Sequence, residues 1–195
     1  MTLKKFLNSQ VLKSIKDFKK KHSEIFDFAI YGSIIRGRTN VGDVDIAIIF
    51  SSPQKLEIKL NLSQKLRNEL KKLTNLDLDI KGIDINDLSD KSFLAGKSII
   101  AEGYLVIKKK FFCEFFGFNN YYIFNYSLTN LSMSKKVMLQ YALHGRRGEK
   151  GIINDTKSSS IGKGVIKVPL ESSEEFREFF EKNNINYKIH KCLLY

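Results

Sequence analysis

Apolar and polar positions follow two periods along this chain. Between residues 3 and 22, apolar residues recur every three or four positions with lysines between them, which predicts an amphipathic helix. Residues 25–31 and 44–50 are short, mostly apolar runs, typical of buried strands, and each ends at turn-forming residues. The pattern then predicts a helix over 53–73 with Pro53 in its first turn, a strand over 76–85, a helix over 92–101 and an extended piece over 104–107.

The chain changes character after the lysine triplet 108–110, which we take as the boundary between a first domain, 1–110, and a second, 111–195. Residues 111–126 are densely aromatic, so we expect them to fill a core or a seam between domains; the alternative is an exposed platform for base stacking. The second domain is expected to be a small α/β unit, with a strand from about 121, a helix over 132–143, a strand over 164–168, a helix over 172–182 opened by a capping box, and a strand over 185–193.

Composition places the chain among ordinary globular proteins, with 195 residues, 43% hydrophobic and 28% charged. No apolar run is long enough for a membrane span, and the N-terminal segment lacks the apolar block of a signal peptide, so we expect a cytoplasmic protein without membrane contact. Cys113 and Cys192 lie far apart, and the three histidines are scattered. This pattern argues against a zinc site, which needs about four nitrogen or sulfur ligands.

The net charge of +12 is the bulk property that bears most on function. A surplus of this size favours polyanionic partners, such as nucleic acid or a nucleoside triphosphate. Lysine-rich chains are also often simply soluble, so the charge alone suggests a partner without identifying it.

Residues 31–38 have the sequence Tyr-Gly-Ser-Ile-Ile-Arg-Gly-Arg, at the end of the first predicted strand. Gly32 carries no side chain that would obstruct a phosphate. Ser33 is expected to open a short helix, whose free backbone amides and hydroxyl would then point at an anion. Arg36 and Arg38 would add cationic donors nearby.

Asp43 and Asp45 are two residues apart at the start of the next predicted strand, so they project from one face while Val44 and Ile46 enter the core. Two adjacent carboxylates repel each other unless a cation neutralises them. Mg²⁺ prefers oxygen ligands that are shared between protein and substrate phosphates. The pattern therefore predicts a metal-held phosphate site; the alternative is that Asp43 caps a turn and Asp45 pairs with an arginine.

A third carboxylate is expected on the strand over 76–85, where it would help to place an attacking hydroxyl. Asp77 and Asp79 share one face of that strand. We prefer Asp79 because it sits further inside the strand, with Asp77 as its rival.

A Gly-Ser turn, nine residues, an Asp-x-Asp strand and a later aspartate together resemble the DNA polymerase β-type nucleotidyltransferase superfamily. Within that superfamily, the segment Gly32 to Gly37 is similar to the Gly-Ser-x-x-Arg-Gly of prokaryotic minimal nucleotidyltransferases. The resemblance covers about residues 20–107 and departs at Gly42, where many members carry Ser or Thr.

The resemblance implies an α/β (α+β) fold with a mixed sheet flanked by helices, followed here by the C-terminal α/β unit. It also implies that Gly32 and Ser33, with Arg36, bind the triphosphate of an NTP, for which we expect ATP. Asp43 and Asp45 would bind two Mg²⁺ (or Mn²⁺) ions, with Asp79 (or its rival Asp77) as a further ligand that helps to activate the acceptor hydroxyl.

The loop over 144–151 mixes glycines with Arg146, Arg147 and Lys150. Such a loop can approach a phosphate backbone closely, so these cations are candidate contacts for RNA or DNA. An ordinary solvated connection is an equal alternative.

We therefore expect an enzyme that transfers NMP from an NTP to a hydroxyl acceptor (RNA, DNA, protein or small molecule) and releases pyrophosphate. One rival is a catalytically weak regulator that binds nucleotide or nucleic acid. The other is the antitoxin of a minimal-nucleotidyltransferase pair, which would bind a small helical protein partner.

Overall fold

A computed structural model describes residues 2–37 and 42–195 and divides the chain into two compact units. The first runs to Asn119 and also includes Tyr195, whereas the second is Asn120–Leu194. The observed boundary lies after the expected one at Lys110, because the short helix that follows Lys110 packs against the first unit. Within the described ranges, no helix has both the length and the apolar character needed to cross a membrane.

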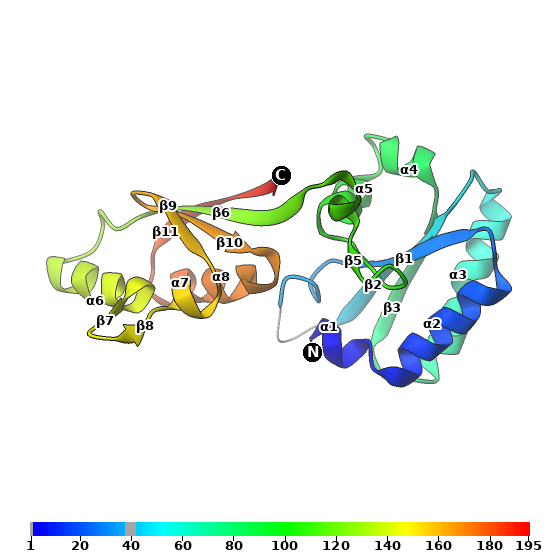
Figure 1. The fold of residues 1–195 in the computed structure, drawn as a ribbon, viewed down its shortest axis with the longest axis horizontal. Coiled ribbons are helices and arrows are strands. Elements are labelled where there is room, and N and C mark those ends of the chain that lie inside the picture. Colours follow the sequence, from blue (N-terminus) through cyan, green and yellow to red (C-terminus); the bar gives the residue numbers. More distant parts are fainter. Residues whose placement is uncertain (1, 38–41) are drawn as a thin grey trace. The chain divides into compact units, whose positions relative to one another are not determined.

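The first unit is built on a mixed five-stranded sheet of order β3-β2-β1-β4-β5, which confirms the expected fold class (Figure 1). Strand β2 pairs antiparallel with β1 and parallel with β3. The elements of this unit are α1 (Leu3–Phe6), α2 (Ser9–Lys21), β1 (Ile25–Tyr31), β2 (Asp43–Phe50), α3 (Leu56–Lys71), β3 (Asp77–Ile83), α4 (Ile85–Ser89), α5 (Leu94–Glu102), β4 (Tyr104–Leu105), β5 (Lys110–Phe111) and the 3₁₀ helix η1 (Phe112–Phe116).

The single helix expected over 3–22 is interrupted, so that prediction was wrong in one respect. Asn8 has extended backbone dihedrals and its side chain accepts hydrogen bonds from the backbone amides of Gln10 and Val11. Asparagine at this position is a strong N-cap, so it ends α1 and starts α2.

The sheet buries both faces, because alternate strand residues point to opposite sides. On one face, Phe28 of β1 contacts Phe18 of α2 edge to face. On the other, Ala47 and Ile49 of β2 join a core cluster with Ile99 of α5. The aspartates at the N-terminal ends of β2 and β3 lie on this second face, beyond the edge of its apolar core.

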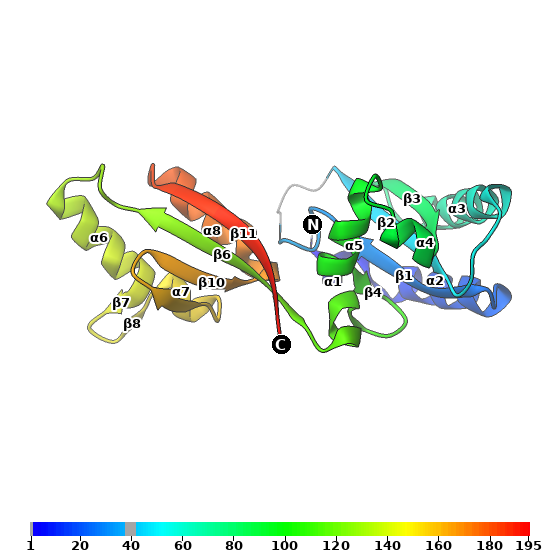
Figure 2. The same ribbon diagram turned by 90° about the horizontal axis from the view of Figure 1, so that it is seen from above.

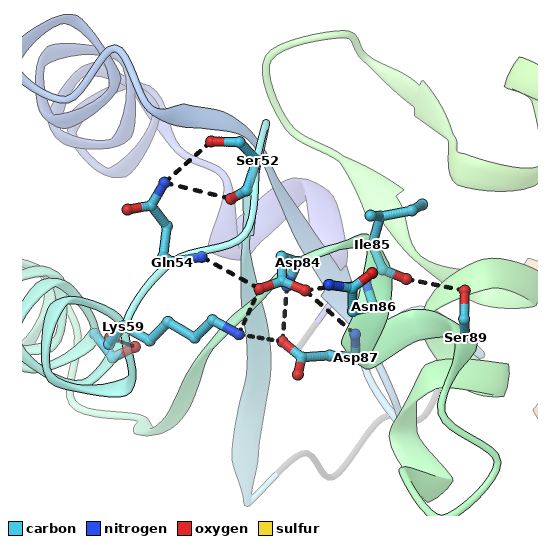
Figure 3. Close-up of polar contacts among 9 residues, drawn as sticks. Ser52, Gln54, Lys59, Asp84, Ile85, Asn86, Asp87 and Ser89 are labelled. Atoms are coloured by element: carbon cyan, nitrogen blue, oxygen red, sulfur yellow. Dashed lines mark hydrogen bonds and ion pairs between the residues drawn. The ribbon is translucent and has the colours of Figure 1, made fainter.

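Helix α3 starts at Leu56, with Lys55 as its N-cap, so the placement of Pro53 in its first turn was wrong. Lys59 of α3 reaches α4 and forms ion pairs with Asp84 at 2.7 Å and Asp87 at 2.6 Å (Figure 3). Asp84 also caps α4 by accepting from the backbone amides of Asn86 and Asp87. This partly buried network fixes α4 at the end of β3.

The second unit contains a four-stranded sheet of order β11-β6-β10-β9, and α8 runs along it (Figure 2). Its core is aromatic: Phe124 lies within 5.7 Å of Phe176 and 5.6 Å of Phe180, ring centroid to centroid. The elements are β6 (Asn119–Ser127), α6 (Met133–His144), β7 (Gly145–Arg146), β8 (Glu149–Lys150), α7 (Ile152–Asp155), β9 (Ser159–Gly162), β10 (Val165–Pro169), the 3₁₀ helix η2 (Leu170–Ser172), α8 (Ser173–Lys182) and β11 (Asn186–Leu194).

The aromatic segment fills cores in part, since Phe112, Tyr122, Phe124 and Tyr126 are buried. Phe115 and Phe116 are exposed, at 40% and 61% of their surface. The capping box expected at residues 172–175 is not formed: Ser172 is the last residue of the 3₁₀ helix η2, and its side chain makes no capping hydrogen bond.

Candidate active site

Gly32 ends β1 with φ at +82°, a left-handed conformation that other residues rarely adopt. A β-carbon at this position would overlap Asp45 Oδ2. The glycine therefore serves two purposes: it reverses the chain, and it lets the backbone lie directly against a carboxylate. Because of this close approach, the turn at Gly32 and the aspartates of β2 belong to the same candidate site.

The segment after Gly32 consists of turns over residues 33–37, not the short helix that we expected Ser33 to open. Gly37 again has a left-handed φ of +87°, outside the right-handed helical range, so the backbone leaves any helical path there. Ile34 and Ile35 between them are buried, which anchors the turn in the core. Arg38, a second cation expected here, lies outside the described residues.

Four aspartates lie on one face of the sheet at the N-terminal ends of β2 and β3. The parallel register places Asp43 beside Asp77 and Asp45 beside Asp79. Between them in sequence, Val44 is fully buried on the opposite face, as the alternation predicted. The sequence could not supply this register, because a helix separates the two strands.

The same register continues onto β1, where Tyr31 lies opposite Asp45. Tyr31, Asp45 and Asp79 thus form one row across three adjacent strands. We call these three residues the β1–β3 row.

The surroundings of Asp45 disfavour its charged form. Burial raises its pKa, and the neighbouring carboxylates of Asp43 and Asp79 raise it further, whereas Lys81 and Arg36 act in the opposite direction. A carboxylate destabilised in this way gains from a bound cation.

Asp79 and Asp77 differ in their surroundings. Asp79 Oδ2 is 2.7 Å from Lys81 Nζ, and Asp79 is one of the groups that raise the pKa of Asp45. Asp77 is 84% exposed at its side chain and lies 3.6 Å from the exposed Lys71. Of the two, Asp79 is therefore the one whose charge acts on Asp45.

The donor set fits a hard divalent cation held by two protein carboxylates. In the described part of the chain, no three His, Cys, Asp or Glu side chains gather closely enough to hold a metal ion by themselves. Asp79 Oδ2 forms an ion pair with Lys81. Mg²⁺ is commonly bound by only one or two carboxylates together with substrate phosphates, so Asp43 and Asp45 suit it.

Arg36 has a structural contact that the sequence did not suggest. Its Nη1 donates to Glu102 Oε2 of α5 at 2.9 Å, and the Glu102 side chain is only 2% exposed. The arginine therefore compensates a buried carboxylate while it also acts on the pKa of Asp45. It ties the turn after Gly32 to α5.

Sequence reasoning missed Tyr31, Lys81 and Glu102 as members of this site. Two of them carried a usable signal: Tyr31 directly precedes Gly32, and Lys81 is two positions after Asp79 on an alternating strand. Glu102 carried none, because it is distant in sequence and its role depends on packing.

In the second unit, the expected cationic loop is an ordered hairpin. Arg147 and Gly148 both have positive φ, at 51° and 90°, which is the two-residue turn that matches strand twist. Arg146 lies over the Tyr141 ring, 4.4 Å from guanidinium carbon to centroid. Arg147 and Lys150 are exposed.

Comparisons with known proteins identify a family for the first unit. The model of a family described as Polymerase beta, Nucleotidyltransferase matches residues 13–111. No curated protein matches the chain. Among solved structures, the chain is similar to a crystal structure of the toxin–antitoxin MntA–HepT, with 18% identity, 49% of this chain and 68% of that chain covered, and a TM-score of 0.34.

Two further structures show the same level of similarity. One is a crystal structure of a toxin–antitoxin with AMP-PNP, at 20% identity, 49% and 71% coverage and a TM-score of 0.36. The other is the tri-AMPylated Shewanella oneidensis HEPN toxin in complex with MNT antitoxin, at 18% identity, 49% and 68% coverage and a TM-score of 0.34.

Proposed function

The chain belongs to the polymerase β nucleotidyltransferase family, and on that premise we propose that it transfers a nucleoside monophosphate from an NTP, ATP foremost, to a hydroxyl acceptor. In this reaction the acceptor oxygen bonds to the α-phosphorus, the bond from that phosphorus to the β-phosphate oxygen breaks, and pyrophosphate leaves with the electron pair. The proton of the acceptor hydroxyl passes to a carboxylate of the protein.

One observation supports this proposal above the others. The Gly32 backbone lies directly against Asp45, which has Asp43 beside it on β2 and Asp79 opposite it on β3. A backbone without a side chain gives a phosphate access to the turn, and carboxylates within reach of that phosphate can share a cation with it. An ordinary turn-capping aspartate would not account for the row of carboxylates.

Each residue then has a defined task. Gly32 and Ser33 orient the triphosphate, while Asp43 and Asp45 hold Mg²⁺ or Mn²⁺. The bound cation supplies neutralisation of phosphate charge and alignment of the reacting oxygens. Asp79 positions the acceptor hydroxyl and accepts its proton, for which it has to leave the 2.7 Å ion pair with Lys81.

Arg36 has a supporting task in this proposal. Its guanidinium lies close enough to affect the pKa of Asp45, so it adds positive potential beside the carboxylates and the bound triphosphate. Because it is also paired with Glu102, its position is set by α5 instead of by the nucleotide.

For the second unit, we propose a role in holding a polyanionic acceptor, RNA or DNA. The exposed cations Arg147 and Lys150 on an ordered hairpin support this role, together with the net charge of +12. Basic side chains on a fixed hairpin can track phosphates without sequence preference.

The test is a transfer assay with Mg²⁺ and labelled NTPs against RNA, DNA, protein and small-molecule acceptors. We expect label to reach at least one acceptor class and to be lost in Asp43→Asn and Asp45→Asn. Transfer that persists in those variants would refute the assigned metal ligands. Failure of the whole panel, with NTP binding retained, would instead favour a regulator or an antitoxin that captures its partner without turnover.

A further inference from the structure

The hydroxyl group of Tyr31 is buried and takes part in no hydrogen bond of the described fold. The residue is 5% exposed, and its Oη has no hydrogen-bond partner within residues 2–37 and 42–195. Buried hydroxyl groups in proteins are almost always hydrogen-bonded, because leaving one unpaired forfeits its bond to water. A phenylalanine would fill the same apolar cluster without that cost, so the hydroxyl needs another explanation.

The position of Tyr31 indicates where a partner would come from. Tyr31 lies opposite Asp45 in the antiparallel pair of β1 and β2, and directly opposed residues project side by side from one face. Asp79 continues the row on β3. Burial, and then the charges of Asp45 and Asp79, raise the pKa of Tyr31, so the phenol remains protonated and can only donate to these carboxylates.

We propose that Tyr31 is a positioning residue for Asp45, whose carboxylate accepts a hydrogen bond from Tyr31 Oη when cation and nucleotide are bound. The proposal rests on the proposed function, because it assigns Asp45 as a cation ligand. Carboxylates that bind metal ions are themselves generally held by hydrogen-bond donors, which set their orientation.

The proposed hydrogen bond from Tyr31 to Asp45 is not formed in the arrangement that Asp45 has here. Asp45 Oδ2 lies against Gly32, and neither carboxylate oxygen accepts from Tyr31 in this arrangement. The proposed bond therefore requires a turn of the Asp45 carboxylate, whose Oδ2 now lies beside the Gly32 backbone. After this turn, the Tyr31 hydroxyl can donate a hydrogen bond to the Asp45 carboxylate.

The experiment compares Tyr31→Phe with the natural chain by Mn²⁺ titration, in which electron paramagnetic resonance measures the free ion with and without a non-hydrolysable NTP analogue. We expect the variant to bind Mn²⁺ about tenfold more weakly, the usual effect of removing a donor behind a metal ligand. Without Mn²⁺, its thermal midpoint should be unchanged or higher, because the hydroxyl has no partner to lose.

Tyr104→Phe is the matched control. Tyr104 is also partly buried with a raised pKa, but it pairs with Ile30 and so faces away from the carboxylates. Its Mn²⁺ affinity should stay at the natural value.

Equal Mn²⁺ affinity of Tyr31→Phe and the natural chain would overturn the positioning role and leave the proposed function intact. Absence of Mn²⁺ binding by the natural chain, with the nucleotide analogue present, would overturn the proposed function and this inference with it. A fall in the metal-free thermal midpoint of Tyr31→Phe would show that the hydroxyl serves the fold, and would also count against the proposal.

Discussion

Asp45 Oδ2 occupies the space that a β-carbon of residue 32 would need, so Gly32 and Asp45 fit together only because residue 32 is glycine. The left-handed φ of Gly32 adds a second reason for glycine at this position. Because two independent constraints apply to Gly32, substituting this residue tests the proposed site directly.

Gly32→Ala should lower the free energy of unfolding by about 1–3 kcal/mol, the usual cost of a side chain in left-handed backbone, and should abolish NTP binding by displacing Asp45. Chemical denaturation and nucleotide titration measure the two effects. Gly42→Ala is the control, because a β-carbon there would meet nothing within 4 Å. Normal nucleotide binding by Gly32→Ala would show that the close approach is not needed.

Arg36→Ala should destabilise the first unit by about 2–4 kcal/mol, because it removes the cation that is paired with the buried Glu102 carboxylate. In the double variant Arg36→Ala/Glu102→Gln, part of that stability should return, since the buried group is then neutral. Urea denaturation measures the free energies of unfolding of the two variants, which are then compared. If the double variant is no more stable than Arg36→Ala, the ion pair is not the source of the destabilisation.

Asp79→Asn should reduce turnover by about 10²–10⁴-fold, as expected for removal of a proton acceptor, with a much smaller effect on nucleotide binding. Asp77→Asn should stay within a few-fold of the natural rate, because Asp77 is exposed and outside the β1–β3 row. Steady-state kinetics with the acceptor found in the transfer panel make the comparison. A reversed order of the two effects would assign the role to Asp77.

Acid should weaken the contact between α3 and α4. Burial alone would raise the pKa of Asp84, but hydrogen bonds from Lys59 and from backbone amides outweigh it and lower the pKa below 3.8. Because the folded pKa lies below the unfolded one, the stabilisation is complete above about pH 4 and disappears as the pH falls through the folded value. Denaturation midpoints between pH 2 and 7 should therefore fall less steeply in acid for Asp84→Asn than for the natural chain.

The hairpin of the second unit should contribute to polyanion binding through charge alone. Arg147→Ala/Lys150→Ala should reduce the slope of log affinity against log salt for RNA or DNA by about two, or about one for each phosphate that the variant no longer neutralises. Lys182→Ala, which removes a cation from the end of α8, serves as a control and should leave the slope unchanged. An unaltered slope in the hairpin variant would remove the hairpin from the binding surface.

Local pattern was enough to predict where several residues of the candidate site lie in the fold. Alternation along one strand placed Asp43 and Asp45 on a common face, and the glycine before Ser33 marked the turn. These properties depend on neighbours within a few residues, and the chain's own periodicity determines them. The same kind of reasoning failed at Asn8 and Pro53, where a cap and a helix start shifted by a few positions.

Tertiary structure alone decided which of these groups meet. Strand periodicity places a residue on a face, but the register between strands follows from the packing of the whole sheet. That register put Asp45 between Tyr31 and Asp79, and packing of α5 brought Glu102 to Arg36. The sequence by itself therefore determined the chemistry that this site has available, and the long-range pairing of strands and helices decided its arrangement.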